Sequence, residues 1–184
     1  MASLTDFRNK LTGGGARANQ FSVRINSPFI ADTEALSFLC RSASLPAMTI
    51  GEVPVFYRGR QIYVAGDRTY ADWTVTVYND GGWVARSNLE NWNNALQDIG
   101  NSTVGAQDTS QYYGMIFVKQ LDRSDNPLRF AQLQDAWPTN VAEIALAYDT
   151  VDVVEEFDVT FRFNYMQLHG SGSSLGSGAG GGEE

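Results

Sequence analysis

Apolar and polar residues alternate with a period of two along several segments of this chain, and no other feature constrains its fold as strongly. The pattern is clearest in residues 21–25, 73–78 and 157–165, where Val, Ile, Phe, Trp or Tyr occupies every second position. Successive side chains of a β-strand point to opposite faces, so each segment is predicted to be a strand with one apolar and one polar face. Residues 36–45 and 144–148 follow the pattern less closely and are weaker strand candidates.

A strand of a different kind is predicted at residues 112–121, which are apolar on both faces, as a central strand would be. Asn126-Pro127 then indicates a turn toward a further strand at residues 128–133. These segments together predict a mainly β fold, an antiparallel β-sandwich or barrel-like protomer.

One segment has the period of a helix. Ala85, Leu89, Trp92, Leu96 and Ile99 follow one another at steps of four and three residues, which places them on one stripe of an amphipathic helix. The sequence therefore predicts one flanking α-helix at residues 83–99, entered through Asn79-Asp80-Gly81-Gly82 and stopped at Gly100. Its outer side is expected to face solvent or a partner with Glu90, Asn91, Asn94 and Asp98.

The composition of the two ends separates them from the folded part. Residues 1–15 indicate a polar N-terminal arm, and residues 16–169 form the predicted β domain. Residues 170–184 are rich in Gly and Ser, with one leucine to bury, and are expected to form a flexible tail.

Residues 53–66 are predicted to form a long hairpin, because Arg58-Gly59-Arg60 can turn between two extended arms rich in Val, Ile, Tyr and Phe. Such a hairpin exposes more apolar surface and strand edge than a monomer should leave open. It either folds back onto its own sheet or covers a neighbouring subunit. For the second case the contact residues are expected to be Val53, Val55, Phe56, Tyr57, Arg58, Arg60, Ile62 and Tyr63.

The charges are distributed unevenly along the chain, whose formal net charge is −8. Residues 1–68 carry a balance of +3 and residues 69–184 one of −11. This asymmetry suits a head-to-tail contact between the hairpin region of one copy and an acidic surface of the next. With this net negative charge and only two lysines, sequence-independent binding of nucleic acid is not expected.

Candidate chemistry is sparse. A single cysteine, Cys40, and a single histidine, His169, exclude an internal disulfide and a zinc site built from several such ligands. The carboxylates of residues 149–158 are read as a solvated edge, because Glu155 and Glu156 would point to opposite faces of a strand. We therefore expect no enzyme, no cofactor and no metal site. No apolar run approaches the roughly 20 residues of a membrane span, so no membrane insertion is expected.

Residues 64–80 resemble the tail tube proteins of T-even-like contractile-tailed bacteriophages. The motif residues are Ala65, Gly66, Asp67, Arg68, Thr69, Asp72 and Trp73, and a later block begins with Trp137 and Pro138. Residues 21–25, 44–46 and 157–165 extend the resemblance, in the order of the family, over residues 16–166. The glycine-rich tail departs from the family pattern.

The resemblance implies hexameric rings whose inner strands join into one continuous β-barrel, and a hairpin that reaches the adjacent ring. Rings would stack into a tube inside a contractile sheath, with tail sheath, tape measure, baseplate hub and tail terminator proteins as partners. The tube would belong to the virion, assemble in the host cytoplasm and conduct DNA without binding it specifically. From the −11 balance of residues 69–184 we expect an acidic lumen.

Two alternatives remain from the sequence. The tube protein of a type VI secretion system or of a phage-derived bacteriocin shares the fold. A monomeric β-sandwich could instead bind a ligand such as a carbohydrate through Tyr57, Tyr63 or Trp83.

Overall fold

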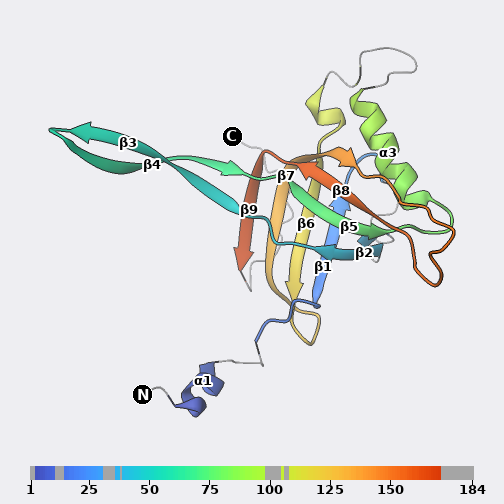
Figure 1. Ribbon diagram of the computed structural model, residues 1–184, viewed down its shortest axis with the longest axis horizontal. Helices are drawn as coiled ribbons and strands as arrows, with labels where there is room; N and C mark the ends of the chain where they lie inside the picture. Colours follow the sequence, from blue (N-terminus) through green and yellow to red (C-terminus); the bar gives the residue numbers. More distant parts are fainter. Residues whose placement is uncertain are drawn as a thin grey trace, which may run out of the picture.

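The computed structural model describes residues 3–10, 15–30, 36–37, 39–97, 105 and 108–170 (Figure 1). The strands are β1 (Phe21–Asn26), β2 (Cys40–Ala43), β3 (Met48–Tyr57), β4 (Arg60–Tyr70), β5 (Trp73–Tyr78), β6 (Gly114–Leu121), β7 (Pro127–Val141), β8 (Glu156–Arg162) and β9 (Tyr165–Gly170). The helices are α1 (Leu4–Lys10) and α3 (Val84–Leu96), and a 3₁₀ turn covers Thr109–Gln111. The mainly antiparallel β fold with a flanking helix is confirmed.

Strand β7 belongs to two layers. Its N-terminal part pairs with β6 on one side and β9 on the other, and its C-terminal part pairs with β8. The first layer is therefore β1, β6, β7 and β9, and the second is β7, β8, β5 and β2, all antiparallel. The register with β6 shifts opposite Asp135, whose φ of 54° lies in the left-handed region. A bulge of this kind bends a strand, so β7 can pass from one layer into the other.

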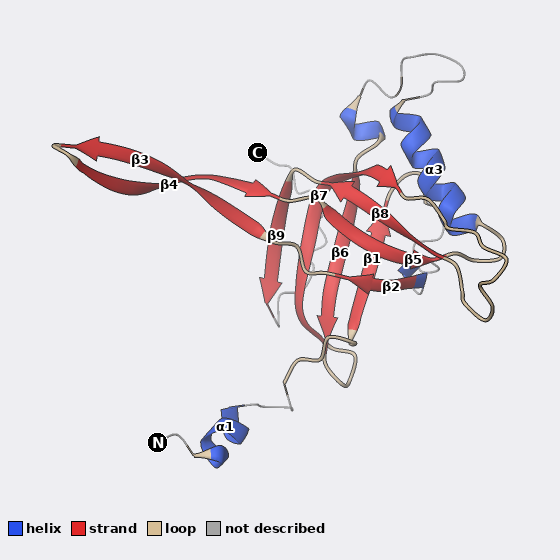
Figure 2. Ribbon diagram, in the orientation of Figure 1, coloured by secondary structure: helices blue, strands red, loops and turns tan. Residues whose placement is uncertain are grey.

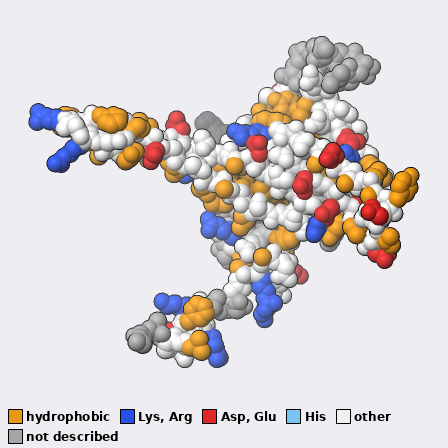
Figure 3. Space-filling model, viewed as in Figure 1, with side chains coloured by type: hydrophobic (Ala, Val, Ile, Leu, Met, Phe, Trp, Pro, Cys, Tyr) orange, Lys and Arg blue, Asp and Glu red, His pale blue; other side chains and the backbone are white. Residues whose placement is uncertain are grey.

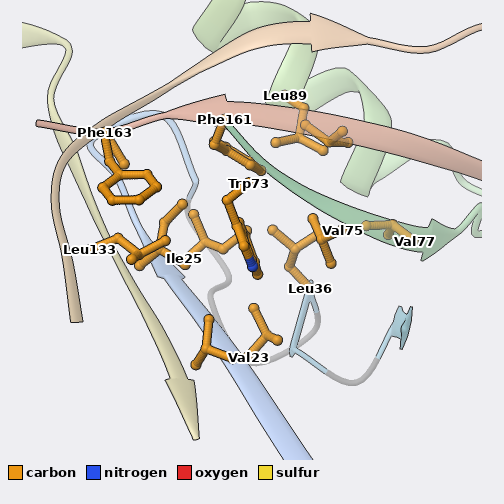
Figure 4. Packing of buried hydrophobic residues seen from close by; sticks show 14 of the residues in the cluster. Val23, Ile25, Leu36, Trp73, Val75, Val77, Leu89, Leu133, Phe161 and Phe163 are labelled. Atoms are coloured by element: carbon orange, nitrogen blue, oxygen red, sulfur yellow. The ribbon is translucent and has the colours of Figure 1, made fainter. Parts of the chain in front are cut away.

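The two layers share one hydrophobic core. Figure 4 shows Val23, Ile25 and Leu133 of the first layer facing Trp73 and Phe161 of the second. The Trp73 ring lies 5.9 Å from that of Phe161, and its indole N–H donates to the carbonyl of Ser44 at 2.7 Å. A buried tryptophan thus keeps a partner for its only polar atom.

Helix α3 covers the edge of the second layer that the end of β7 would otherwise leave open. Leu89 and Trp92 are fully buried, and the Trp92 indole donates to the carbonyl of Tyr112 at 2.7 Å. One turn closer to the start of the helix, the Arg86 guanidinium donates to the carbonyl of Ala142, just beyond β7, at 3.0 Å. Of the predicted apolar stripe, Ala85, Leu89 and Trp92 are buried and Leu96 is half-buried, while Ile99 lies outside the described residues.

The start of α3 is held by a carboxylate. The backbone N–H groups of Ala85 and Val84 each donate to Asp80 at 3.1 Å. These bonds, that of Ala85 first, hold the pKa of Asp80 below its ordinary value. The helix ends at Leu96, three residues earlier than expected, and Asp98, Ile99 and Gly100 lie outside the described residues.

Several strand predictions need correction. Residues 157–165 form two strands rather than one, because the chain leaves the second layer after Arg162 and joins β7 in the first layer from Tyr165. The alternation changes phase there: Phe163 and Met166 are buried, whereas Tyr165 is exposed. The central strand starts at Gly114, since residues 109–111 form the 3₁₀ turn.

The two weaker strand candidates, residues 144–148 and 36–45, are wrong in whole or in part. Residues 144–148 are not a strand, because they have no strand to pair with, and Leu146 and Tyr148 are exposed. Of residues 36–45 only Cys40–Ala43 is a strand, while Leu36 and Leu39 are helical. Within the polar arm, Leu4–Lys10 is a short helix with no buried residue.

Candidate assembly interface

The hairpin formed by β3 and β4 projects from the body of the protein (Figure 2). Its strands pair with each other in a separate two-stranded sheet and with no other strand of the described chain. The turn has Arg58 and Gly59 at φ 47° and 79°, as a two-residue type I′ turn requires. The hairpin is longer than predicted, and the interpretation that it folds back onto its own sheet is wrong.

Both faces of the hairpin are apolar. Cross-strand partners share a face, and the register pairs Val53 with Val64, Val55 with Ile62, and Tyr57 with Arg60 on one of them. The opposite face pairs Pro54 with Tyr63 and Phe56 with Gln61. All of these side chains are exposed, Phe56 by 72% and Ile62 by 58%. A two-sided apolar ribbon of this length marks an interaction surface.

The family motif begins where this hairpin bends. A Cβ at Gly66 would lie 3.1 Å from the backbone of Gly51, at the point where the register of β3 and β4 shifts. Glycine at position 66 therefore lets the two strands approach closely at a bulge. The other motif residues of β4, Ala65, Asp67, Arg68 and Thr69, are exposed along its base.

The remaining motif residues are structural parts of the body. Asp72 and Arg162 form a salt bridge, in which Nη1 of Arg162 lies 2.8 Å from Oδ1 of Asp72, and both side chains are about half exposed. Trp73 is in the core, Pro138 is fully buried, and Trp137 stacks on Tyr113 with ring centroids 5.6 Å apart. The motif thus joins a surface ribbon to the core that anchors it.

The first layer has two open edges, which the sequence analysis did not assign. Among the described strands, none pairs with the outer edge of β1 or of β9. Strand β1 runs antiparallel to β6, β6 to β7, and β7 to β9. A β9 edge placed beside the β1 edge of a second copy would therefore continue the antiparallel order without interruption.

The face of the first layer turned away from the core has one carboxylate beside it, that of Asp135 at the bulge of β7, which lines a pocket with Asn26, Met115 and Gln134. The pairing register defines three rows across its strands, since Val23, Ile25, Ile116, Val118 and Leu133 take the core side. Two rows are Ser22, Lys119, Phe130 and His169, and Arg24, Phe117, Gln132 and Gln167. The register of β6 and β7 shifts beyond them, and the third row consists of the separate pairs Asn26–Met115 and Gln134–Tyr165. Phe130 stacks on His169 with centroids 4.5 Å apart. The alternation predicted Ser22, Arg24 and Asn26 as polar positions of one strand, but it did not predict the face that they share with Phe117 and Phe130, both of which are buried.

The acidic residues gather elsewhere, on the second layer and on residues 142–155, which we call the acidic loop. The loop contains Glu143, Asp149, Asp152 and Glu155 and no Lys or Arg. Figure 3 shows acidic side chains on this side of the body and basic ones at the end of the hairpin. Glu155 accepts from Asn79 at 3.0 Å, whereas Glu156 pairs with Arg41. The two carboxylates have separate partners, but they do not lie on opposite faces of one strand as predicted, because Glu155 precedes β8 and both residues line the same pocket.

The polar side of α3 is where the sequence predicted it. Glu90, Asn91 and Asn94 are exposed, and Glu90 accepts an ion pair from Arg86 at 2.7 Å. These residues leave an outward surface that a partner could reach.

The described part of the chain contains few groups with the properties of a nucleophile or a metal ligand. Burial raises the pKa of the Cys40 thiol to about 12, so the thiol stays protonated and is a poor nucleophile. No group of three or more His, Cys, Asp or Glu side chains able to hold a metal ion occurs among the described residues. In the same residues, no helix has the length and apolar character needed to cross a bilayer.

A compact β core with two open sheet edges and a long apolar hairpin defines a structural subunit that assembles with copies of itself. Residues 16–168 match the family described as phage tail tube protein. The chain therefore belongs to the phage tail tube protein family, as residues 64–80 predicted, and is a virion component of a contractile phage tail.

Curated relatives agree with this placement. The chain is 33% identical over 157 residues to the tail tube protein gp19 of Enterobacteria phage T4, which covers 85% of this chain and 93% of that protein. It is 26% identical over 172 residues to the tail tube protein of Serratia phage KSP90, covering 89% and 95% of the two chains.

Solved structures share the fold at low identity. A chain of the sheath–tube complex of the PVC extracellular contractile injection system, in its extended state, has a TM-score of 0.64 at 13% identity, covering 92% of this chain and 99% of that one. A chain of the anti-feeding prophage baseplate has a TM-score of 0.64 at 14% identity, covering 86% and 97%. These similarities confirm the fold, and the phage relatives favour a phage tail over a secretion system.

Proposed function

We propose that six copies of this chain close into a ring through their first layers, and that the rings stack into a hollow conduit. The observation that carries the proposal is the pair of open edges, β1 and β9, on opposite sides of one four-stranded layer. The two edges differ, so their contact is head-to-tail, and a head-to-tail contact closes into a ring when its rotation permits. Closure would also remove the exposed strand edges.

In such a ring the outward face of the first layer becomes the channel wall, because its other face is filled by the shared core. The wall would then consist of Ser, Asn and Gln side chains, Arg24 and Lys119, interleaved with Met115, Phe117, Phe130 and Tyr165, and the three rows contain no carboxylate. This replaces the acidic lumen expected from the charge balance by a weakly basic one that mixes polar and aromatic side chains. The carboxylates of the second layer and the acidic loop would lie outside the channel.

The hairpin supplies the contact between subunits that ring closure alone does not. Its two apolar faces need cover, and a neighbouring copy offers that cover at every position of a repeating tube. Val53, Val55, Phe56, Tyr57, Arg58, Arg60, Ile62 and Tyr63 are the proposed contact residues.

The other roles follow from the family and its structural neighbours. The tube would lie inside a contractile sheath, which the exposed side of α3 would face, and would end on baseplate hub and tail terminator proteins. It would hold the tape measure protein and later conduct DNA. In this role the protein has no catalytic function.

Electron microscopy of the purified protein tests the proposal. We expect hollow tubes or rings with sixfold symmetry, and size-exclusion chromatography should show assembly that increases with protein concentration. A protein that stays monomeric at every concentration and salt level would contradict the proposal, and would favour the alternative that the chain is a monomeric ligand-binding β-sandwich.

A further inference from the structure

The acidic loop forms one wall of a surface pocket of about 610 Å³. The pocket combines apolar with charged side chains: Leu146, Val153 and Val154 line it, as do Asp152, Glu155 and the ion pair of Glu156 with Arg41. The three apolar side chains are exposed to solvent. Asp152 has no hydrogen-bond or ion-pair partner among the described residues. Arg41 neutralises Glu156, but Asp152 and Glu155 have no cationic partner among the described residues. Apolar side chains beside these two carboxylates suit an apolar ligand that carries positive charge.

The end of the hairpin has the complementary chemistry. Arg58 and Arg60 flank Gly59, and the Arg58 guanidinium lies 5.3 Å from the ring centroid of Tyr57. Tyr57 and Arg60 share a face with Val55 and Ile62, so this face offers an aromatic ring, aliphatic side chains and a cation together.

The backbone at the hairpin end supports a functional role for the arginine. Arg58 has a φ of 47°, a left-handed conformation that Asn, Asp or Gly adopts more readily at the first central position of a type I′ turn. A non-glycine residue in such a region is held at some conformational cost. An arginine at this position favours local stability less than the usual turn residues do, which points to a use for its side chain.

The two surfaces lie on opposite sides of the molecule. In Figure 1 the hairpin extends beyond the β9 side of the body, and the loop between β7 and β8 lies on the other side, beyond β5 and β2. One copy therefore cannot satisfy its own pocket, whereas a neighbour placed head-to-tail can.

We propose that the hairpin end of one copy, through Tyr57, Arg58 and Arg60, docks into the pocket beside the acidic loop of a neighbouring copy. The occupant is a second copy of this chain, chosen because the hairpin matches the pocket in charge and in apolar character. This inference rests on the proposed function, since it names the surface that receives the hairpin in the tube.

Charge reversal with mixing tests the contact. One variant carries Arg58→Glu and Arg60→Glu, and the other carries Asp152→Lys and Glu155→Lys, the two pocket carboxylates without a cationic partner among the described residues. We expect each alone to need at least tenfold more protein than the wild type to form tubes. An equimolar mixture should recover assembly near the wild-type threshold, because each reversed surface then meets a reversed partner and each unchanged surface an unchanged one.

The control reverses carboxylates away from the pocket. Glu90→Lys with Asp125→Lys makes the same charge change, and Asp125 has a left-handed backbone like that of Asp152. This variant should assemble alone and should not rescue the arginine variant. Should the lysine variant of the loop fail to fold by circular dichroism, Asp152→Asn with Glu155→Gln is used instead, and we expect it to raise the threshold in low salt.

The outcomes separate the two proposals. Wild-type protein that forms no tubes in the same buffer contradicts the proposed function itself. If the wild type assembles and the loop variant does too, the pocket does not receive the hairpin and is open to another partner, such as the sheath. Variants that fail alone and also fail as a mixture overturn the docking as well.

Discussion

The indole of Trp92 occupies the space that a side chain on Gly114 would need. A Cβ at Gly114 would lie 2.6 Å from Cη2 of Trp92 and 2.8 Å from the carbonyl oxygen of Asn26. Real Cβ atoms do not approach other atoms so closely, and both neighbours are fixed, one by burial and the other as backbone. The absence of a side chain at the start of β6 is thus what allows α3 to pack.

Replacing Gly114 by alanine is therefore expected to destabilise the fold. Overpacking a close-packed core costs about 1–3 kcal/mol. Urea denaturation of the protein, at concentrations below its polymerisation threshold, measures the change in the free energy of unfolding. Gly81→Ala is the matched control, since a Cβ there meets nothing within 4 Å. Equal stability of the two variants would show that α3 packs differently.

Removing the carboxylate of Asp80 should loosen the start of α3. Asp80→Ala removes the acceptor of the Val84 and Ala85 N–H groups, a loss of about 1 kcal/mol by analogy with helix N-caps. Asp80→Asn keeps an oxygen acceptor and should lose less. Unfolding curves of the three proteins at neutral pH make the comparison.

The same residue gives a pH dependence. The pKa of Asp80 is lowered in the folded protein, so its stabilising contribution is complete above the ordinary Asp pKa of about 3.9 and is lost as the pH falls through the lowered value. The stability difference between the wild type and Asp80→Ala should therefore shrink below about pH 4. A difference that is constant down to pH 2 would exclude the carboxylate as the cause.

The sequence predicted the strands and the helix that can be recognised from local periodicity alone, whichever strand they pair with. The alternation at residues 21–25 and 73–78 identified β1 and β5, and the stripe through Leu89 and Trp92 identified α3. The sequence also predicted a turn at Arg58-Gly59 between two apolar arms, and the structure shows that this turn is of type I′. Each of these depends on local periodicity or local turn chemistry.

What the sequence could not predict depends on long-range pairing. Residues 157–165 alternate throughout, yet the chain changes layer after Arg162, and only the pairing of β7 with β8 and then β9 shows this. Residues 144–148 alternate without any strand to pair with. The outward face of the first layer is a property of register, so the cross-strand rows could not be assembled from one strand at a time.

The two faces of the hairpin can be tested separately. Phe56→Asp places a charge on one face and Ile62→Asp on the other, and both side chains are exposed in the single chain. Each variant should keep the thermal stability of the wild type. Burying an uncompensated carboxylate costs several kcal/mol, so a face that is covered in the tube should block growth.

Electron microscopy of both variants then shows which face is covered. Loss of tubes for one variant alone identifies a one-sided contact, and loss for both identifies a hairpin enclosed on two sides. Normal tubes from both would exclude the hairpin as an assembly element. Asn91→Asp on α3 is the control for added charge on an exposed surface.

The charge of the channel wall should affect how DNA moves through it. If the outward face of the first layer lines the channel, Gln167 faces the DNA, whereas Asn91 on α3 lies on the outside. Every ring repeats the wall, so a lysine at position 167 adds attraction for phosphate at each step along the tube. We expect phage carrying Gln167→Lys to eject DNA more slowly at low salt, with the rate recovering as salt screens the contact. Phage carrying Asn91→Lys should eject at the wild-type rate. Lys119 already lies in the same face, so Lys119→Gln should speed ejection at low salt and weaken the salt dependence of the wild type.

Equal ejection rates for the lysine variants at positions 167 and 91, with sheathed tubes intact in both, would mean that another face of the protein lines the channel.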